Sequence, residues 1–174
     1  VLDCYRRGTI HQTSIKNSKS RILKDGKNLK NCSGVAALPD GLNIIYANDW
    51  SIYQLDLETL EEKTWHTAPG PISEIAVSRN GKFVMHAGAY DEIVSINTLT
   101  KETKSIEKIS KKVDALIPLD DGVHFLEASS HGDFYGSRIY LRNVENGESG
   151  IICDISKHSR EDGHNKAIAM AVLY

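Results

Sequence analysis

Two patterns of apolar and polar residues recur along the chain with the same period. The first is a polar turn that ends in Asp-Gly or Asn-Gly between stretches of strand-forming residues. Its glycines, Gly41, Gly81 and Gly122, lie 40 and 41 positions apart. Asp-Gly and Asn-Gly tolerate the positive φ angles of a tight hairpin turn, so each turn predicts two antiparallel strands. Apolar residues keep the same distances from the three glycines: Cys32, Ile72 and Val113 lie nine positions before, Val35, Ile75 and Leu116 six before, and Ile44, Val84 and Phe125 three after.

The second pattern is a strand-like hexapeptide followed by a polar turn and another strand-like segment. It begins at Ile10, Ile52, Ile93 and Ile139, which lie 42, 41 and 46 positions apart. Combined with the first pattern, it gives four short antiparallel strands in about 41 residues, the unit of a β-propeller blade. A helical period of 3.6 residues is missing from every longer segment, which indicates an all-β chain.

We therefore predict an all-β fold, a β-propeller or partial propeller of about four blades with four antiparallel strands each. The blades are expected at 1–28 (partial), 30–68, 70–109, 111–156 and 166–174 (partial), so both chain ends fall mid-blade. A β-sandwich also has short strands, but it has no reason to repeat its turn sequence at this period. Two arrangements stay open: a piece of a longer propeller, which we favour, or four blades that close when the first and last segments share a sheet.

The repeats resemble those of WD-repeat and related YVTN-type β-propellers over nearly the whole chain. The closest stretch is 51–59, which falls where that family has a strand ending in Trp-Asp. The pair reads Leu55-Asp56, Ile96-Asn97, Arg142-Asn143 and Thr13-Ser14, and the Gly-His dipeptide that opens many family repeats is missing. The resemblance implies the propeller architecture and a partner-binding face formed by the second-to-third strand loops and the connections between blades.

An aspartate recurs in the second-to-third strand loop, as Asp49, Asp91 and Asp133. A short carboxylate at such a position can accept backbone N–H bonds and hold the turn. The matching aspartate of WD-like repeats is structural. We predict the same role for these three residues.

Functional residues are expected where the repeat is irregular. The last full blade is stretched at 131–136, and the connection that follows it, 157–165, is long and polar. Loops often carry binding residues, and aromatic residues and Arg are enriched in interface hot spots. We predict that a protein partner binds this face through seven residues: Trp50, Tyr90, His131, Phe134, Tyr135, His158 and Arg160.

Other interpretations of these loops stay open, including ordinary solvated loops. Five residues have donor types that suit a metal or an acid–base pair, namely His131, Asp133, His158, Asp162 and His164. Their spacing fixes no geometry, and no nucleophile elbow, Gly-rich phosphate loop or His-Glu-x-x-His motif accompanies them. We predict no catalytic residue, no metal and no cofactor. We also predict that Trp65 packs in the core and that His86 and His124 are strand histidines with their hydrogen bonds satisfied.

Composition narrows the class of partner. The formal net charge of −2 argues against nucleic acid. Apolar runs stay shorter than the 18 or so residues of a membrane-spanning helix, which argues against a membrane. Cys4, Cys32 and Cys153 form no Cys-x-x-Cys pair, so we expect three buried thiols and a reducing compartment, the cytoplasm or nucleus. The expected partners are a protein, further blades of a parent chain, or another copy of this chain.

Two functions follow from these observations. The first is a protein-interaction scaffold that binds a protein partner through the loop face. Under this prediction the chain is not an enzyme. The second is an enzyme or small-ligand sensor that uses the propeller face or central channel. It requires convergent polar residues at the inner ends of the first strands, where Ala36, Ala37, Ala76 and Ala115 are small and apolar. These alanines favour the scaffold.

Overall fold

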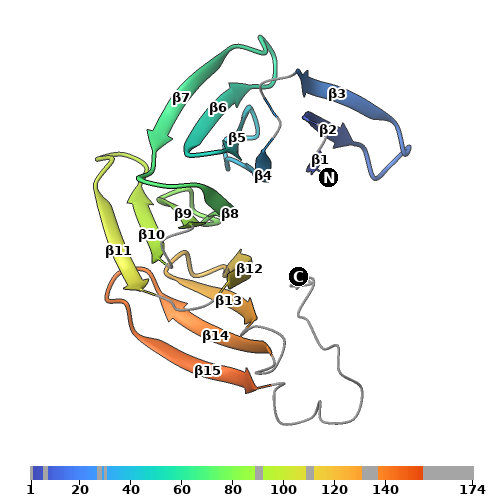
Figure 1. The fold of residues 1–174 in the computed structure, drawn as a ribbon. Coiled ribbons are helices and arrows are strands. Elements are labelled where there is room, and N and C mark those ends of the chain that lie inside the picture. The colour runs from blue at the N-terminus through green and yellow to red at the C-terminus, as the bar shows by residue number, and fades with distance from the viewer. Residues whose placement is uncertain are drawn as a thin grey trace.

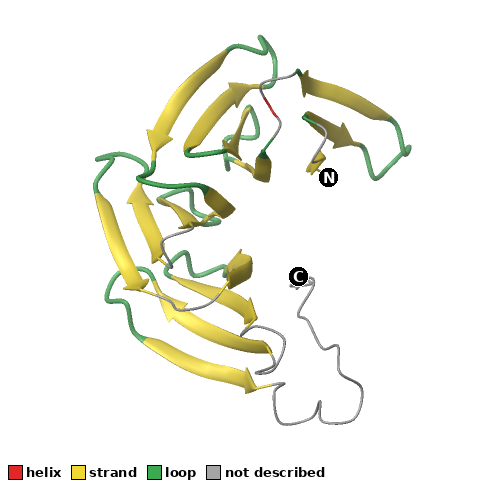
Figure 2. Cartoon of the chain, viewed as in Figure 1, coloured by secondary structure: helices red, strands yellow, loops and turns green. Residues whose placement is uncertain are grey.

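The computed structural model describes residues 2–5, 8–26, 29, 31–88, 92–108, 112–130 and 137–154. Figure 2 shows that strands joined by short loops make up most of this part of the chain. The strands are β1 (Leu2–Tyr5), β2 (Thr9–Thr13), β3 (Ser20–Asp25), β4 (Cys32–Ala37), β5 (Asn43–Asn48), β6 (Ser51–Asp56), β7 (Glu62–Thr67), β8 (Ile72–Val77), β9 (Phe83–Gly88), β10 (Glu92–Asn97), β11 (Thr103–Lys108), β12 (Lys112–Pro118), β13 (His124–Ser130), β14 (Ser137–Asn143) and β15 (Ser149–Asp154).

The strands form one three-stranded and three four-stranded antiparallel sheets, each in chain order: β1-β2-β3, β4-β5-β6-β7, β8-β9-β10-β11 and β12-β13-β14-β15. The sheets stand in an arc around a common centre, with β4, β8 and β12 innermost and β7, β11 and β15 outermost (Figure 1). The inner strand β8 contacts both β4 and β12. The predicted all-β, propeller-type fold is confirmed. The blade boundaries within 1–174 stay a prediction, and the segment 166–174 lies outside the described residues.

Among the described residues the hydrophobic core forms three clusters, one at each boundary between neighbouring sheets. Ile10 and Leu23 pack with Ile44 at the first boundary. Ile45 of β5 and Ile75 of β8 belong to the second cluster. The third joins the β8 sheet to the β12 sheet, with Met85, Ile93, Leu116 and Phe125 among its members. Burial of these side chains from water, at roughly 25 cal/mol per Å² of apolar surface, holds each blade to the next.

The outermost strand of each sheet carries one extra residue. The register between the last two strands skips one residue in every sheet: Leu23 in β3, Trp65 in β7, Ile106 in β11 and Ile152 in β15. A bulge of this kind re-aims a side chain. Leu23 is buried, and Trp65 and Ile106 pack against the clusters. The fourth, Ile152, is 58% exposed. The predicted packing role of Trp65 agrees with its contacts.

The predicted Asp-Gly turns form as the sequence indicates. Gly41, Gly81 and Gly122 have φ values of +68°, +70° and +71°. The side chain before each glycine accepts backbone N–H groups of the same turn, two at Asp40 and Asp121 and one at Asn80. The Asp40 carboxylate accepts from Leu42 and Asn43, both at 2.9 Å.

The polar turns between the third and fourth strands are held in the same way. The side-chain oxygens of Asp56, Asn97 and Asn143 each accept two backbone N–H bonds, from the second and third residues that follow. These three residues occupy the position of the family's Trp-Asp aspartate. An Asx side chain therefore closes this turn in every full sheet.

The cysteines differ from the prediction of three buried thiols. Cys32 is 6% exposed and is disulfide-bonded. Cys153 is a free, exposed thiol in β15. The sequence could not reveal this, because the widely spaced cysteines follow no motif and their distance depends on the tertiary fold.

Candidate partner-binding face

One end of each sheet carries both the second-to-third strand loop and the connection to the next sheet. An antiparallel meander of four strands places these two connections at the same end, and we call this end of the molecule the loop face. In the described residues it includes the turn 49–50 between β5 and β6 and the connection 68–71 between β7 and β8. The Asp-Gly and Asx turns lie at the opposite end, which we call the turn face.

Trp50 is the predicted binding residue that the structure describes, and it is 50% exposed on the loop face. Its backbone carbonyl accepts the Ala68 N–H at 2.8 Å, which ties the turn to the connection leading into β8. The side chain is therefore presented by a turn whose backbone is fixed on both sides. An exposed indole on a rigid support loses little entropy on binding, which is typical of interface anchors.

Asp49 precedes Trp50 and has a φ of +54°. Its carbonyl accepts the Ile72 N–H at 2.8 Å, and its carboxylate accepts a hydrogen bond from the Asn31 side chain. Asp49 thus links the ends of β4 and β8 to the turn. These contacts agree with the predicted structural role of Asp49, which stays a prediction.

The other predicted residues of this face lie outside the described residues. They are Tyr90, Asp91, His131, Asp133, Phe134, Tyr135, His158 and Arg160. Their predicted roles stay predictions.

A polar hollow of about 370 Å³ lies between the first two sheets. Lys24 of β3 and the Tyr46 hydroxyl both donate to the Glu62 carboxylate across it. Tyr46 stacks on Tyr53, with ring centroids 5.3 Å apart. Burial, reinforced by the bond to Glu62, raises the pKa of Tyr46, so its hydroxyl stays a donor at neutral pH. The sequence analysis did not single out this group, whose members come from four strands and a connection.

A second, smaller hollow of about 20 Å³ lies between the second and third sheets, close to the loop face. Pro69, Gly70, Gly88, Glu92 and His86 are among the residues that line it. The volume accommodates about one water molecule or ion. Trp50 itself lines neither hollow. Asn48, two residues before it, lines the first, and Ala68, whose N–H bonds to the Trp50 carbonyl, lines the second.

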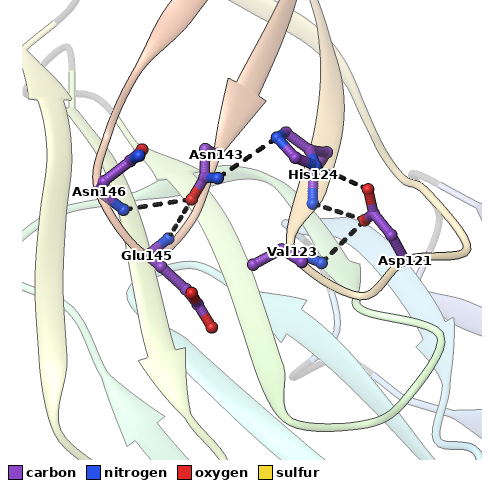
Figure 3. A network of polar contacts seen from close by, with 6 residues as sticks. All are labelled: Asp121, Val123, His124, Asn143, Glu145 and Asn146. Carbon is purple, nitrogen blue, oxygen red and sulfur yellow. Dashed lines mark hydrogen bonds and ion pairs between the residues drawn. The ribbon is translucent and has the colours of Figure 1, made fainter.

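His86 contradicts the prediction of a satisfied strand histidine. The residue is 3% exposed, and its Nδ1 has no hydrogen-bond partner among the described residues. His124 behaves as predicted. Its Nδ1 lies 2.6 Å from the Asp121 carboxylate, and its Nε2 accepts from the Asn143 amide at 3.3 Å (Figure 3). The difference arises because His124 begins its strand beside an Asx turn, whereas His86 faces the neighbouring sheet.

The innermost strands carry acidic residues in addition to the alanines noted in the sequence. Glu74 lies in β8 two positions before Ala76, and Asp114 lies in β12 beside Ala115. Burial raises the pKa of Glu74 to about 7, against a smaller opposing effect of its bond from the Ile75 N–H. A carboxyl group that is half protonated near neutral pH is a candidate acid or base. Neither residue is a repeat-wide feature, so the alignment of repeats did not draw attention to it.

Clusters of three or more His, Cys, Asp or Glu side chains with metal-binding geometry are missing from the described residues. The same part of the chain contains no helix that is both long and apolar enough to cross a membrane.

The chain matches no protein-family model and no curated protein sequence. Among solved structures it is similar to TolB from Acinetobacter baumannii, with a TM-score of 0.65 and 19% identity over 82% of this chain and 37% of that one. A TolB candidate from Agrobacterium tumefaciens gives a TM-score of 0.63 and 17% identity over 84% of this chain and 60% of that one. Hydrazine synthase from Kuenenia stuttgartiensis gives a TM-score of 0.64 and 16% identity over 83% of this chain and 43% of that one.

The chain thus spans 37%, 60% and 43% of the lengths of these three proteins. Identities of 16–19% show a shared fold and nothing about function. The TolB neighbours support the β-propeller architecture.

Proposed function

We propose that this chain is a non-catalytic interaction scaffold that binds a protein partner through its loop face. The proposal includes a propeller of the WD-repeat or YVTN type. The support for that type is the Asx turn, in which Asp56, Asn97 and Asn143 occupy the Trp-Asp position and close equivalent turns.

The observation that carries the proposal is Trp50. Large exposed apolar side chains also occur on the turn face, for example Leu99 at 88% exposure. Trp50 differs because it lies on the loop face and its backbone carbonyl accepts the Ala68 N–H, which ties the turn to the next connection. Trp is among the residues enriched in interface hot spots.

The test compares Trp50→Ala with Leu99→Ala, a truncation of a still more exposed side chain on the opposite face. The partner is first captured with a chain that keeps Trp50 and carries a photo-crosslinker at position 67, where Thr67 pairs with Ser51, or, as a control, at position 99. Affinity is then measured for both alanine variants. We expect Trp50→Ala to weaken binding by 2 kcal/mol or more, about thirtyfold, and Leu99→Ala to leave it unchanged. Equal affinities of the two variants, or crosslinking only from position 99, would refute the loop face as the binding surface.

A second candidate function is an enzyme or small-ligand sensor that uses the central channel. The observation that favours it is the Glu74 carboxyl on an inner strand, with a pKa of about 7. Glu74→Gln distinguishes the two functions, since it removes the ionisable group at a distance from Trp50. A scaffold keeps its partner affinity in this variant, whereas a channel enzyme or sensor loses activity or ligand.

The cytoplasmic or nuclear location stays a prediction, and the disulfide at Cys32 favours a different one. Disulfides persist mainly in oxidising compartments. We therefore extend the proposal to a scaffold that works in an oxidising compartment. Fractionation of the source cells, with the thiol state of Cys32 read by alkylation before lysis, tests this extension. Recovery of the chain in the reducing fraction with a free Cys32 would refute it.

A further inference from the structure

The polar hollow between the first two sheets has the size of a small-molecule pocket. Its volume is about 370 Å³, and pockets that hold small ligands span roughly 300–1,000 Å³. The first sheet contributes Lys24 and Asp25 of β3 to the lining. The second sheet contributes Tyr46, Tyr53 and Glu62, which come from three different strands. The hollow therefore exists only where the two sheets meet.

The carboxylate of Glu62 keeps one oxygen available to a ligand. Lys24 and the Tyr46 hydroxyl both donate to Oε2. Oε1 accepts no hydrogen bond from the residues that the structure describes. Burial raises the pKa of Tyr46, so its hydroxyl remains protonated and keeps the carboxylate in place. The Glu62 side chain is 27% exposed, so a molecule in the hollow can reach Oε1.

Lys24 and Asp25 add further bonding capacity to the same hollow. The Lys24 ammonium has three N–H donors, and its contact with Glu62 uses one of them. This ammonium lies 5.9 Å from the centre of the Tyr46 ring, which keeps it against the wall of the hollow. The Asp25 carboxylate makes no hydrogen bond or ion pair within the described part of the chain. One donor group and two acceptor groups thus line the hollow with capacity to spare.

Tyr53 supplies an aromatic surface beside these polar groups. Its ring stacks on Tyr46, with centroids 5.3 Å apart and planes inclined by 19°. Tyr46 is 1% exposed, whereas Tyr53 is partly exposed, so Tyr53 is the member of the stack that a ligand can touch. An aromatic ring offers a broad apolar face. This surface suits a ligand that has a flat C–H side and a polar edge.

The mixed charge of the lining narrows the class of ligand. An anion is repelled by Asp25 and Glu62, and a cation is repelled by Lys24. An apolar molecule would remove water from all three groups without replacing its hydrogen bonds, which costs free energy. A hydroxyl group donates one hydrogen bond and accepts others, so it can bind a donor and an acceptor at once. A neutral molecule with several hydroxyl groups therefore matches the lining.

We propose that this hollow binds a neutral polyhydroxyl molecule of the hexose type, either as a free sugar or as a unit of a glycan. One hydroxyl accepts from Lys24 and donates to Oε1 of Glu62, a second donates to Asp25, and the C–H side of the ring packs on Tyr53. This site goes beyond the proposed scaffold function and is independent of it, because Trp50 does not line the hollow.

The test is a titration of the full chain with D-glucose, D-galactose, D-mannose and N-acetyl-D-glucosamine, followed by calorimetry and saturation-transfer NMR. Arginine and sulfate serve as charged probes. We expect saturable binding of at least one of these sugars, with a dissociation constant of about 1 mM or tighter, and none of either charged probe. A glycan array then distinguishes a free sugar from a glycan unit, and recognition of either form supports the proposal.

The variants Glu62→Gln and Asp25→Ala place the sugar in the hollow. In Glu62→Gln, Lys24 and Tyr46 keep the amide oxygen as their acceptor, so an NH₂ group replaces Oε1 and the bond from the sugar is lost. Because hydrogen bonds to charged groups are the stronger ones, we expect binding to weaken about tenfold or more in each variant. Asp25 is exposed and without described contacts, so Asp25→Ala decides the matter even where Glu62→Gln fails to fold.

The matched control is Glu61→Gln, which removes the same charge one position away from Glu62 and outside the lining. This variant should bind the sugar as the wild type does. The proposal is overturned by the absence of saturable binding of all these sugars at tens of millimolar. Binding of arginine or sulfate in their place overturns it, as does sugar affinity that is equal in the wild type, Glu62→Gln and Asp25→Ala.

Discussion

Arg142 of β14 and Glu127 of β13 form an ion pair whose side chains are 1% and 0% exposed. The Ser129 hydroxyl donates to the other oxygen of the Glu127 carboxylate, and the Arg142 guanidinium lies 4.8 Å from the centre of the Tyr140 ring. Arg142 is the cross-strand neighbour of Phe125, which belongs to the third core cluster. Two opposite charges are therefore buried on the side of this sheet that packs against the preceding sheet.

We predict that Arg142→Met lowers the free energy of unfolding by about 3–5 kcal/mol, because it leaves the Glu127 carboxylate buried without its cation. The double variant Arg142→Met, Glu127→Met should recover most of this loss, since it removes both charges and keeps the volume apolar. Urea unfolding of the two variants measures the difference. The control is Arg79→Met, which breaks an exposed pair with Asp120 and should cost less than about 1 kcal/mol. An Arg142→Met cost no larger than that of the control would contradict the prediction.

The turns of the fold could be predicted from sequence because their chemistry is local. Gly41 supplies its own positive φ, and Asp40 reaches N–H groups two and three residues ahead. The same short-range interactions recur in the other blades. The regular repeat of these turns therefore predicts the order of the strands and the propeller-type fold without any information on long-range contacts.

The sequence indicates the buried pair of Arg142 and Glu127 only in part. Arg142 occupies the position of Leu55 and Ile96 in the other repeats, which marks it as a charge at an apolar position. Glu127 stands where the other repeats have Tyr46 and His86. Two opposite charges at core positions of one repeat are a signal that could have predicted the pair.

The candidate sites were harder to predict, because they join strands of different sheets. Trp50 was accessible to sequence reasoning, since it lies in a loop of the repeat. The hollow that joins Lys24 to Glu62 depends on the packing of two blades, which is not encoded by neighbouring residues. The disulfide at Cys32 escaped prediction for the same reason.

The bulge residues of the outer strands should differ in their contribution to stability. Leu23 is 5% exposed between two sheets, so Leu23→Ala should cost about 2–5 kcal/mol of unfolding free energy. Ile152 occupies the equivalent position of β15 but is 58% exposed, so Ile152→Ala should stay within about 0.5 kcal/mol of the wild type. Chemical unfolding of both variants measures the contrast. Similar losses in the two variants would show that Ile152 is covered in solution.

Reduction of the disulfide at Cys32 should destabilise the chain. Disulfides typically contribute about 2–4 kcal/mol, chiefly by restricting the unfolded state. We expect dithiothreitol to lower the urea midpoint of the wild type and of Cys153→Ser, because Cys153 is already a free thiol. In Cys32→Ser the reductant should have no further effect. An equal response of Cys32→Ser and the wild type to the reductant would rule out this bond as the cause.

Glu74 and His86 should give opposite pH dependences of stability over overlapping windows. The pKa of Glu74 rises from 4.5 to about 7 on folding, so the folded chain holds the extra proton between these values. The contribution of Glu74 to the free energy of unfolding is then most favourable below pH 4.5 and is lost as the pH rises through 7. The pKa of His86 falls from 6.5 to about 4, so its contribution is present above pH 6.5 and is lost as the pH falls toward 4.

Glu74→Gln separates these two effects. The variant cannot ionise at this position, so it should match the wild type near pH 4 and exceed it at pH 8. At 1.36 kcal/mol per pKa unit, the gain is up to about 3 kcal/mol. Between these limits the unfolding free energy of Glu74→Gln should rise with pH, because the His86 effect is then unopposed. Urea unfolding from pH 4 to 8 measures both curves, with Glu58→Gln as an exposed control that should follow the wild type. Parallel curves for Glu74→Gln and the wild type would contradict the prediction, because they would mean that folding leaves the pKa of the Glu74 carboxyl unchanged.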